Sequence, residues 1–163
     1  MGFEARFIAE FKDRLISSYK QNWHSEIESE NKYRWFYSFK CIFEPEKYLL
    51  LITNKWLRDM LAKFRSRVRG LKNHKQWVVI REEGDLTCPM CGQASEDEGH
   101  FLSQCQAYVN SRMKYNIFES ATTQFSMKHV STLLAFKDET EIKTLAKYIT
   151  EAMSVRKKKT EQN

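Results

Sequence analysis

The chain has 163 residues and a net charge of +6, and 42% of its residues are hydrophobic, which suits a single domain with a substantial core. Its 2 prolines and 5 glycines are too few for a loop-rich β protein, and no apolar run approaches the roughly 18 residues that span a bilayer. The N-terminus lacks the apolar centre of a signal peptide, so we expect an intracellular protein, in the nucleus or cytoplasm, without a membrane partner. Cysteines are reduced there and serve metals more often than disulfides.

Two helices are predicted in the first half of the chain. The first covers residues 3–19, where apolar side chains recur every three or four positions and share one face. The second covers residues 46–69, with Pro45 at its start, a continuous apolar stripe along it and Gly70 as its stop. Between them, the aromatic segment 32–42 has a period that fits a strand as well as a helix.

In the second half of the chain, one short strand and further helices are predicted. The β-branched segment 77–81 favours a strand, and a turn follows it. The predicted helices are 101–118, 131–136 and 139–156. The last is amphipathic, and Asp138 or Thr140 is placed to cap its first turn. The expected fold is therefore mainly α: a helical domain with a small zinc-tied lobe and room for one short hairpin.

Charge divides the chain more sharply than composition does. Between Lys55 and Arg81 there are nine Lys or Arg and one acid, Asp59, whereas residues 82–100 hold six acids and no Lys or Arg. We expect three regions that pack as one unit. They are a helical, aromatic-rich and basic region at 1–81, a zinc-binding lobe at 82–118, and an amphipathic helix with a basic tail at 119–163.

Four residues carry the strongest chemical signal. Cys88, Cys91, His100 and Cys105 form the pattern C-x2-C-x8-H-x4-C, and the first two bracket a turn. Three thiolates and one imidazole fill all four tetrahedral positions of Zn²⁺ and leave none open for a substrate. The sequence therefore predicts one structural zinc ion. The alternative is that these are ordinary residues of a reduced core, as we expect for Cys41, which has no ligand partner nearby.

No catalytic residue is predicted. Glu96, Asp97 and Glu98 are consecutive rather than on one face, which favours a solvated acidic turn over a magnesium site or an acid–base pair. Glu98 is nevertheless placed to orient His100 from outside the ligand set. The chain has no phosphate-binding glycine loop, nucleophile elbow or polymerase-type aspartate pair, so we do not expect an enzyme.

Three segments resemble a known family when they are taken in order. They are EKYLLLITNKWLRDMLAKFRSRVRGL, CPMCGQASEDEGHFLSQCQAY and STLLAFKDETEIKTLAKYITEAM. Together they resemble the C-terminal zinc-binding region of LINE-type (non-long-terminal-repeat) retrotransposon reverse transcriptase polyproteins. The resemblance implies a nucleic-acid-binding accessory module that lacks the endonuclease and reverse transcriptase domains. One departure is that the family has Cys-Pro-x-Tyr where this chain has Cys105-Gln106-Ala107-Tyr108, so the predicted helix can continue there without a break.

The basic block is the predicted nucleic-acid surface, for RNA or single-stranded nucleic acid, because lysine and arginine bind phosphates without regard to sequence. Its candidate residues are Lys55, Arg58, Lys63, Arg65, Arg67, Arg69, Lys72 and Lys75. Aromatic residues at 33–39 are either stacking rings for bases or core. The alternative for the basic block is a solvated helix face. The alternative for the whole chain is a host-adopted protein-interaction or scaffold module, with contacts through residues 82–98 and the helix 139–156.

Overall fold

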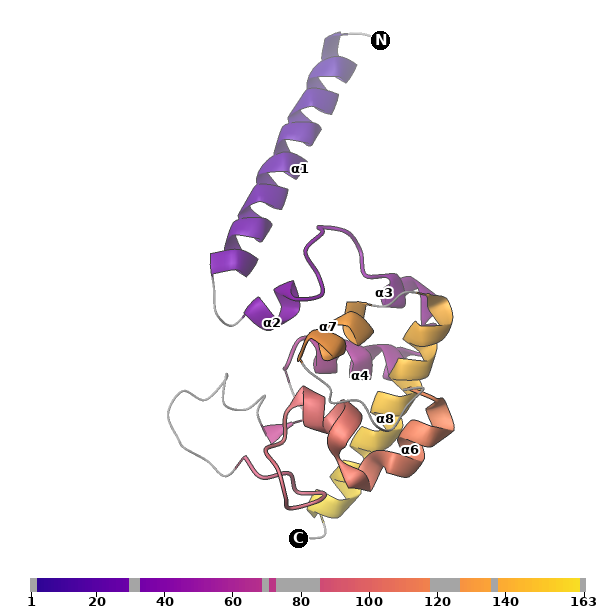
Figure 1. The fold of residues 1–163 in the computed structure, drawn as a ribbon. Helices are drawn as coiled ribbons and strands as arrows, with labels where there is room; N and C mark the ends of the chain where they lie inside the picture. The colour runs from indigo at the N-terminus through magenta and orange to yellow at the C-terminus, as the bar shows by residue number, and fades with distance from the viewer. Residues whose placement is uncertain are drawn as a thin grey trace. The chain divides into compact units, whose positions relative to one another are not determined.

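The computed structural model describes residues 3–29, 33–68, 71–72, 86–117, 127–135 and 138–161. Its contacts form two compact units, Met1–Pro45 and Glu46–Asn163, which we describe separately. All regular elements in the described ranges are helices, which confirms the mainly α fold (Figure 1). None of these helices combines the length and apolarity needed to cross a bilayer. The predicted strand at 77–81 lies outside the described residues.

The first unit consists of α1 (Phe3–Ser29), α2 (Arg34–Tyr37) and the segment that follows them. α1 is ten residues longer than predicted because Trp23 and Ile27 extend its apolar stripe at intervals of four. The ring of Trp23 meets Phe43 edge-on at 5.4 Å, and Ile27 is buried. These contacts stabilise the polar last turns of α1.

The first turns of α1 differ from its last turns in the exposure of their apolar side chains. Its predicted apolar face is present, but in the described structure that face is exposed to solvent. The exposed residues are Phe7, Ile8, Phe11, Leu15, Ile16 and Tyr19. The ambiguous segment 32–42 forms a short helix, α2, whose Trp35 is buried and meets Phe39 edge-on at 5.5 Å.

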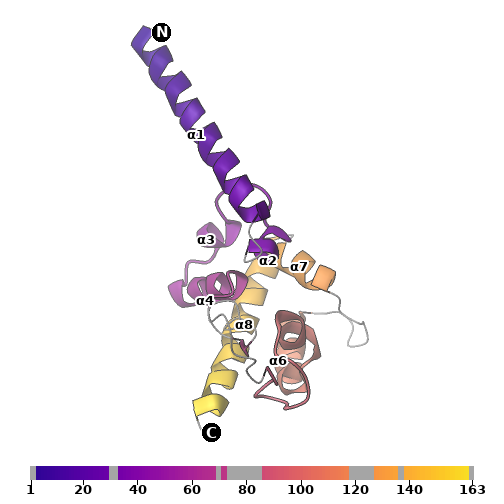
Figure 2. The ribbon, with the colours of Figure 1, turned by 90° about the vertical axis from the view of Figure 1, so that its left-hand side faces the viewer.

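The second unit holds the remaining helices and the predicted metal ligands. In chain order they are α3 (Lys47–Leu51), α4 (Lys55–Arg65), the π-helix η2 (His100–Gln104), the 3-10 helix η3 (Gln106–Tyr108), α6 (Val109–Tyr115), α7 (Met127–Ala135) and α8 (Glu139–Glu161). α3, α4 and α6 all pack against α8, which therefore runs through the middle of the unit (Figure 2). The core includes Leu61 and Phe64 of α4 and Ile142, Leu145 and Ile149 of α8, all fully buried.

The predicted continuous helix 46–69 is wrong, because the chain breaks between α3 and α4. Asn54 leaves the helical conformation and its side chain accepts a hydrogen bond from the backbone N–H of Leu57 at 3.2 Å, which caps α4. The carbonyl of the buried Ile52, freed by the break, accepts a hydrogen bond from Arg58 Nη1 at 3.3 Å. Asparagine side chains form hydrogen bonds to nearby backbone groups and therefore favour the start of a helix over its interior. The continuous apolar stripe of 46–69 masks this signal in the sequence.

α8 begins as predicted and ends five residues later. Asp138 is its cap, since its carboxylate accepts a hydrogen bond from the backbone N–H of Glu141 at 2.9 Å. The predicted apolar face of the helix is buried from Ile142 to Ala152. α7 begins four residues before the predicted 131–136 and buries Val130 and Leu134.

Removing the cap of α8 should destabilise the second unit. Asp138→Ala leaves the N–H of Glu141 without its acceptor, and we expect a loss of about 1 kcal/mol in the free energy of unfolding. Asp138→Asn keeps an acceptor and should lose much less. Urea unfolding followed by circular dichroism measures both, and equal stability of Asp138→Ala and wild type would contradict the capping role.

Candidate metal centre

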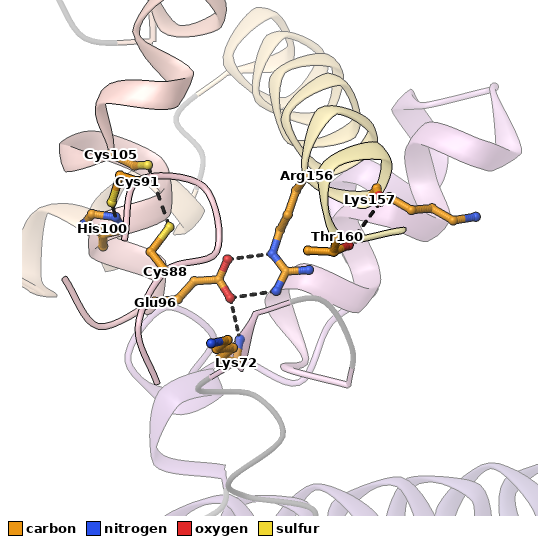
Figure 3. A network of polar contacts seen from close by, with 9 residues as sticks. All are labelled: Lys72, Cys88, Cys91, Glu96, His100, Cys105, Arg156, Lys157 and Thr160. Carbon is orange, nitrogen blue, oxygen red and sulfur yellow. Dashed lines mark hydrogen bonds and ion pairs between the residues drawn. The ribbon is translucent and has the colours of Figure 1, made fainter. Parts of the chain in front are cut away.

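The four predicted ligands converge on one point in the second unit (Figure 3). All their ligand atoms lie within 4.8 Å of one another. The Sγ atoms of Cys88 and Cys105 are 3.9 Å apart, and Cys91 Sγ lies 3.3 Å from His100 Nε2. A tetrahedral ion with bonds of about 2.3 Å to sulfur and about 2.0 Å to nitrogen would set these edges near 3.8 Å and 3.5 Å. The cluster therefore can hold one metal ion, and its sulfurs are far outside the disulfide bond length of about 2.05 Å.

A tight hairpin presents the first two cysteines. The backbone N–H of Cys88 donates to Ala94 O at 2.7 Å, and that of Glu96 donates to Leu86 O at 2.7 Å, around an isolated antiparallel bridge. At the tip, Gly92 donates its N–H to Cys88 O at 2.8 Å and has φ +68°, a conformation that residues with a Cβ rarely adopt. The C-x2-C-G pattern is thus a turn whose geometry requires its glycine, and both sulfurs face one side of it.

A π-helix brings together the other two ligands. Five residues along an α-helix of about 3.6 residues per turn are rotated about 140° apart, so His100 and Cys105 would face different directions. Here Cys105 N–H donates to His100 O at 2.8 Å, the wider i to i+5 bond of a π-turn, and Cys105 itself is extended with ψ 120°. The predicted continuous helix 101–118 is therefore wrong. The chain needs the wide turn and the break at Cys105 for both ligands to reach the centre.

Asp97 fixes the start of this π-turn. Its carboxylate accepts a hydrogen bond from the backbone N–H of His100 at 2.7 Å, and its carbonyl accepts one from Phe101 at 2.9 Å. Burial lowers the pKa of His100, which favours the neutral imidazole that metals bind. Burial also raises the pKa of the Cys105 thiol to about 12, so a metal ion must displace a proton from this thiol when it binds.

The acidic residues between the ligands differ from the prediction. A solvated turn is wrong for Glu96 and Glu98, whose side chains are 1% and 0% exposed. Glu96 accepts two hydrogen bonds from Arg156, at 2.5 Å from Nε and 2.7 Å from Nη2, and a third at 2.7 Å from the backbone N–H of Lys72 (Figure 3). Glu98 accepts hydrogen bonds from Nε and Nη2 of Arg67. Removing the partner of a buried charge is costly, so the guanidinium groups of Arg156 and Arg67 contribute to the stability of the fold.

Glu98 therefore has a structural partner that the sequence did not reveal. The proposed orientation of the His100 ring by Glu98 stays a prediction. Arg67 reaches Glu98 from just beyond the end of α4, where its backbone has φ 55° and the N–H of Val68 donates to Lys63 O at 3.2 Å. A glycine usually occupies this left-handed position after the end of a helix. Here Arg67 occupies it, and its guanidinium reaches Glu98.

Three residues of α8 make hydrogen bonds to the segments that carry the four candidate ligands. The hydroxyl of the buried Tyr148 donates to the carbonyl of Phe101 in the π-turn at 2.9 Å. Two turns further along, Arg156 binds Glu96, and Lys159 Nζ donates to the carbonyl of Met90 at the hairpin tip at 2.8 Å. These three α8 residues are spaced by eight and three, so they share one side of the helix. The ligand-bearing segments are held from outside the metal centre by one helix.

The predicted nucleic-acid residues fall into different environments. Arg65 is 2% exposed, donates to Glu46 Oε2 at 2.5 Å and lies over the Tyr48 ring, and Arg67 is paired as described above. Arg58 and Lys72 are half-buried, whereas Lys55 and Lys63 are exposed. Arg69 and Lys75 lie outside the described residues. The basic block therefore includes buried guanidinium groups as well as exposed ammonium groups.

Sequence reasoning missed the buried ion pairs and one exposed ring. A signal for the Glu96 pair is present, since Arg156 follows Tyr148 and Ala152 at intervals of four and so continues the buried face of α8. Trp56 belongs to the predicted apolar stripe of 46–69, but it is 61% exposed, since the core covers the face of α4 that carries Leu61 and Phe64. Cys41, expected in the core, is also exposed.

Breaking the Glu96 pair should cost far more than breaking a surface pair on the same helix. Arg156→Met leaves Glu96 buried without its guanidinium, and we expect a loss of about 3–5 kcal/mol in the free energy of unfolding. Replacing both partners, as in Glu96→Leu with Arg156→Met, should restore much of it. The matched control is Lys143→Met, which removes the exposed pair with Glu139 and should cost under about 1 kcal/mol.

Urea unfolding of the metal-loaded protein measures these variants. Equal effects of Arg156→Met and Lys143→Met would show that the buried pair does not support the fold.

Comparison with known proteins adds no assignment to this geometry. No protein-family model, no curated protein and no solved structure matches this chain. The chemistry of the centre is therefore that of its own residues: three cysteines and one histidine, mostly buried, that can hold a metal ion.

Proposed function

We propose that the chain is a zinc-stabilised nucleic-acid-binding module, in which one structural zinc ion is bound by Cys88, Cys91, His100 and Cys105. The observation that carries the zinc is the ligand set itself, since three sulfurs and one imidazole nitrogen lie within 4.8 Å of one another. Thiolate-rich tetrahedral sites select zinc over the hard cations that prefer oxygen. Four protein ligands fill the coordination shell, so the ion holds the fold and performs no reaction.

The surroundings of the centre support a structural role. Zinc ties the hairpin to the π-turn, and Arg156, Tyr148 and Lys159 tie both to α8. Without the ion, two thiols and an imidazole that are mostly buried would lose their shared partner. The binding energy of the metal then becomes folding energy of the lobe, as in other small zinc modules.

The nucleic-acid part of the proposal rests on exposed positive charge and on the resemblance to retrotransposon polyproteins. The net charge is +6, and Lys55 and Lys63 extend from α4 on the side away from its buried residues. Phosphate contacts by such lysines are independent of sequence and sensitive to salt. Arg65 and Arg67 contribute differently, since their pairs with Glu46 and Glu98 support the fold that presents the lysines.

A second candidate is a protein-interaction module, and one observation favours it. The first turns of α1 present exposed Phe7, Ile8, Phe11 and Leu15 on one face. A partner that covers this face would be captured by the wild-type chain after nuclease treatment, and Phe7→Ser with Phe11→Ser would lose it. In this alternative the acidic loop contributes little surface, because Glu96 and Glu98 are buried.

Zinc content can be measured directly. Elemental analysis of the purified protein should give about one zinc per chain, because one complete ligand set is present. Cys88→Ser with Cys91→Ser removes half of the ligands and should abolish the bound zinc and lower the melting temperature. Cys41→Ser, which changes an exposed thiol outside the set, is the control and should keep both. A wild-type protein without zinc, or with a Cys88–Cys105 disulfide, would rule out the structural-zinc proposal.

Nucleic-acid affinity should depend on the exposed lysines. Lys55→Ala with Lys63→Ala removes two phosphate contacts, so the dependence of log affinity on log salt should flatten by about 1.4 for a single strand. Lys143→Ala on α8 is the control for a loss of surface charge. Fluorescence anisotropy at several salt concentrations gives the slopes. Identical slopes for the double variant and wild type would remove α4 from the binding surface.

A further inference from the structure

Trp56 is the large aromatic side chain that α4 leaves exposed. It is 61% accessible, whereas Leu61 and Phe64 of the same helix are completely buried against the core. At about 100° per residue, Lys55, Asp59, Lys63 and Trp56 fall within one sector of about 100° around the helix axis. The buried residues occupy the opposite side. One strip of α4 therefore combines an exposed indole with two lysines.

The capped first turn of α4 helps to fix which of its side chains point away from the core. The Asn54 cap fixes the first turn of α4, so the residues that follow in register with Leu61 and Phe64 enter the core, and Trp56 falls outside that register. The ring is thus held on a rigid, capped helix. Isolated exposed apolar residues are common, but an indole with cations beside it is a more specific arrangement.

The lysines of the strip are available for an anion. Within the described residues neither the Lys55 nor the Lys63 ammonium group makes a hydrogen bond or an ion pair, in contrast to the paired guanidinium groups of Arg65 and Arg67. Along the axis they are about 12 Å apart, at a rise of about 1.5 Å per residue. Asp59 is the one acid in α4 and lies between them. It weakens the positive potential of the strip without cancelling it.

We propose that Trp56 is a stacking platform for an unpaired base of a single-stranded nucleic acid, whose phosphates are bound by Lys55 and Lys63. The proposal rests on the nucleic-acid function proposed above and assigns that function a base contact. Unpaired bases expose both π-faces, and exposed aromatic rings beside cations bind them without regard to sequence. A duplex keeps its bases stacked on one another, so it can use the lysines but not the indole. The platform therefore confers a preference for single strands.

Three of the aromatic residues at 33–39 make a poorer platform. Trp35 is buried, and the rings of Phe36 and Phe39 meet edge-on at 5.4 Å, so they are engaged with one another. Trp56 has none of these ring neighbours among the described residues. It is not one of the aromatic residues at 33–39 that the sequence suggests as stacking rings, and it lies on a different face of α4 from the buried Leu61.

The test compares binding of the zinc-loaded full chain to a fluorescent single-stranded oligonucleotide and to the duplex of the same sequence. Trp56→Ala should weaken single-strand binding by about 5- to 150-fold, the range that the loss of one base–aromatic stacking contact gives. The salt dependence should not change, because stacking releases no counterions. Trp56→Phe should keep most of the affinity, and Asp59→Asn should raise it. Oligouridine and oligothymidine arms distinguish RNA from DNA as the preferred strand.

Met113→Ala is the matched control, because Met113 is 75% exposed on α6 and has no role in the strip. Melting temperatures verify that each variant is folded. If wild type binds and the lysine variants weaken it while Trp56→Ala does not, the stacking platform is wrong and the nucleic-acid function stands. An equal loss for single strand and duplex also overturns the platform. If wild type binds neither strand nor duplex, the proposed function itself fails.

Discussion

The second unit depends on a carboxylate buried beside its metal ligands. Glu96 is almost inaccessible, Arg156 binds both of its oxygens, and the backbone N–H of Lys72 adds a third donor. An isolated buried charge is far too costly for a domain of this size, so the loop, α8 and the chain after α4 must be in place together. The metal centre is built on this arrangement, since the hairpin and the π-turn lie on either side of Glu96.

The burial of these ion pairs also divides the basic residues into structural ones and exposed ones. Arginine is suited to a buried pair because its planar fork can bind a carboxylate at two points, as Arg67 and Arg156 do, whereas Arg65 binds Glu46 through Nη1. The exposed charges on α4 are lysines, whose ammonium groups stay hydrated. Arginines thus hold the second unit together, whereas Lys55 and Lys63 of α4 are exposed to solvent. Substituting arginines to test nucleic-acid binding would confuse loss of fold with loss of contact.

Much of the fold was predictable because its signals are local. The stripes of α1 and α8, the Asp138 cap and the C-x2-C turn each depend on residues within a few positions of one another. The predicted helices failed where a local competitor or a distant requirement decided the outcome. Asn54 capped a new helix inside a continuous apolar stripe, and Cys105 broke a helix so that it could join His100 at the metal centre.

By itself the sequence determined the mainly helical architecture and the four residues that could hold a metal ion, because helical period and ligand spacing are properties of short segments. The tertiary structure alone decided which charges are buried. Glu98 pairs with a residue 31 positions away and Glu96 with one 60 positions away, and no local pattern records such a partner. It also decided that Trp56 is exposed, because the direction of a helical side chain depends on which face the rest of the core covers.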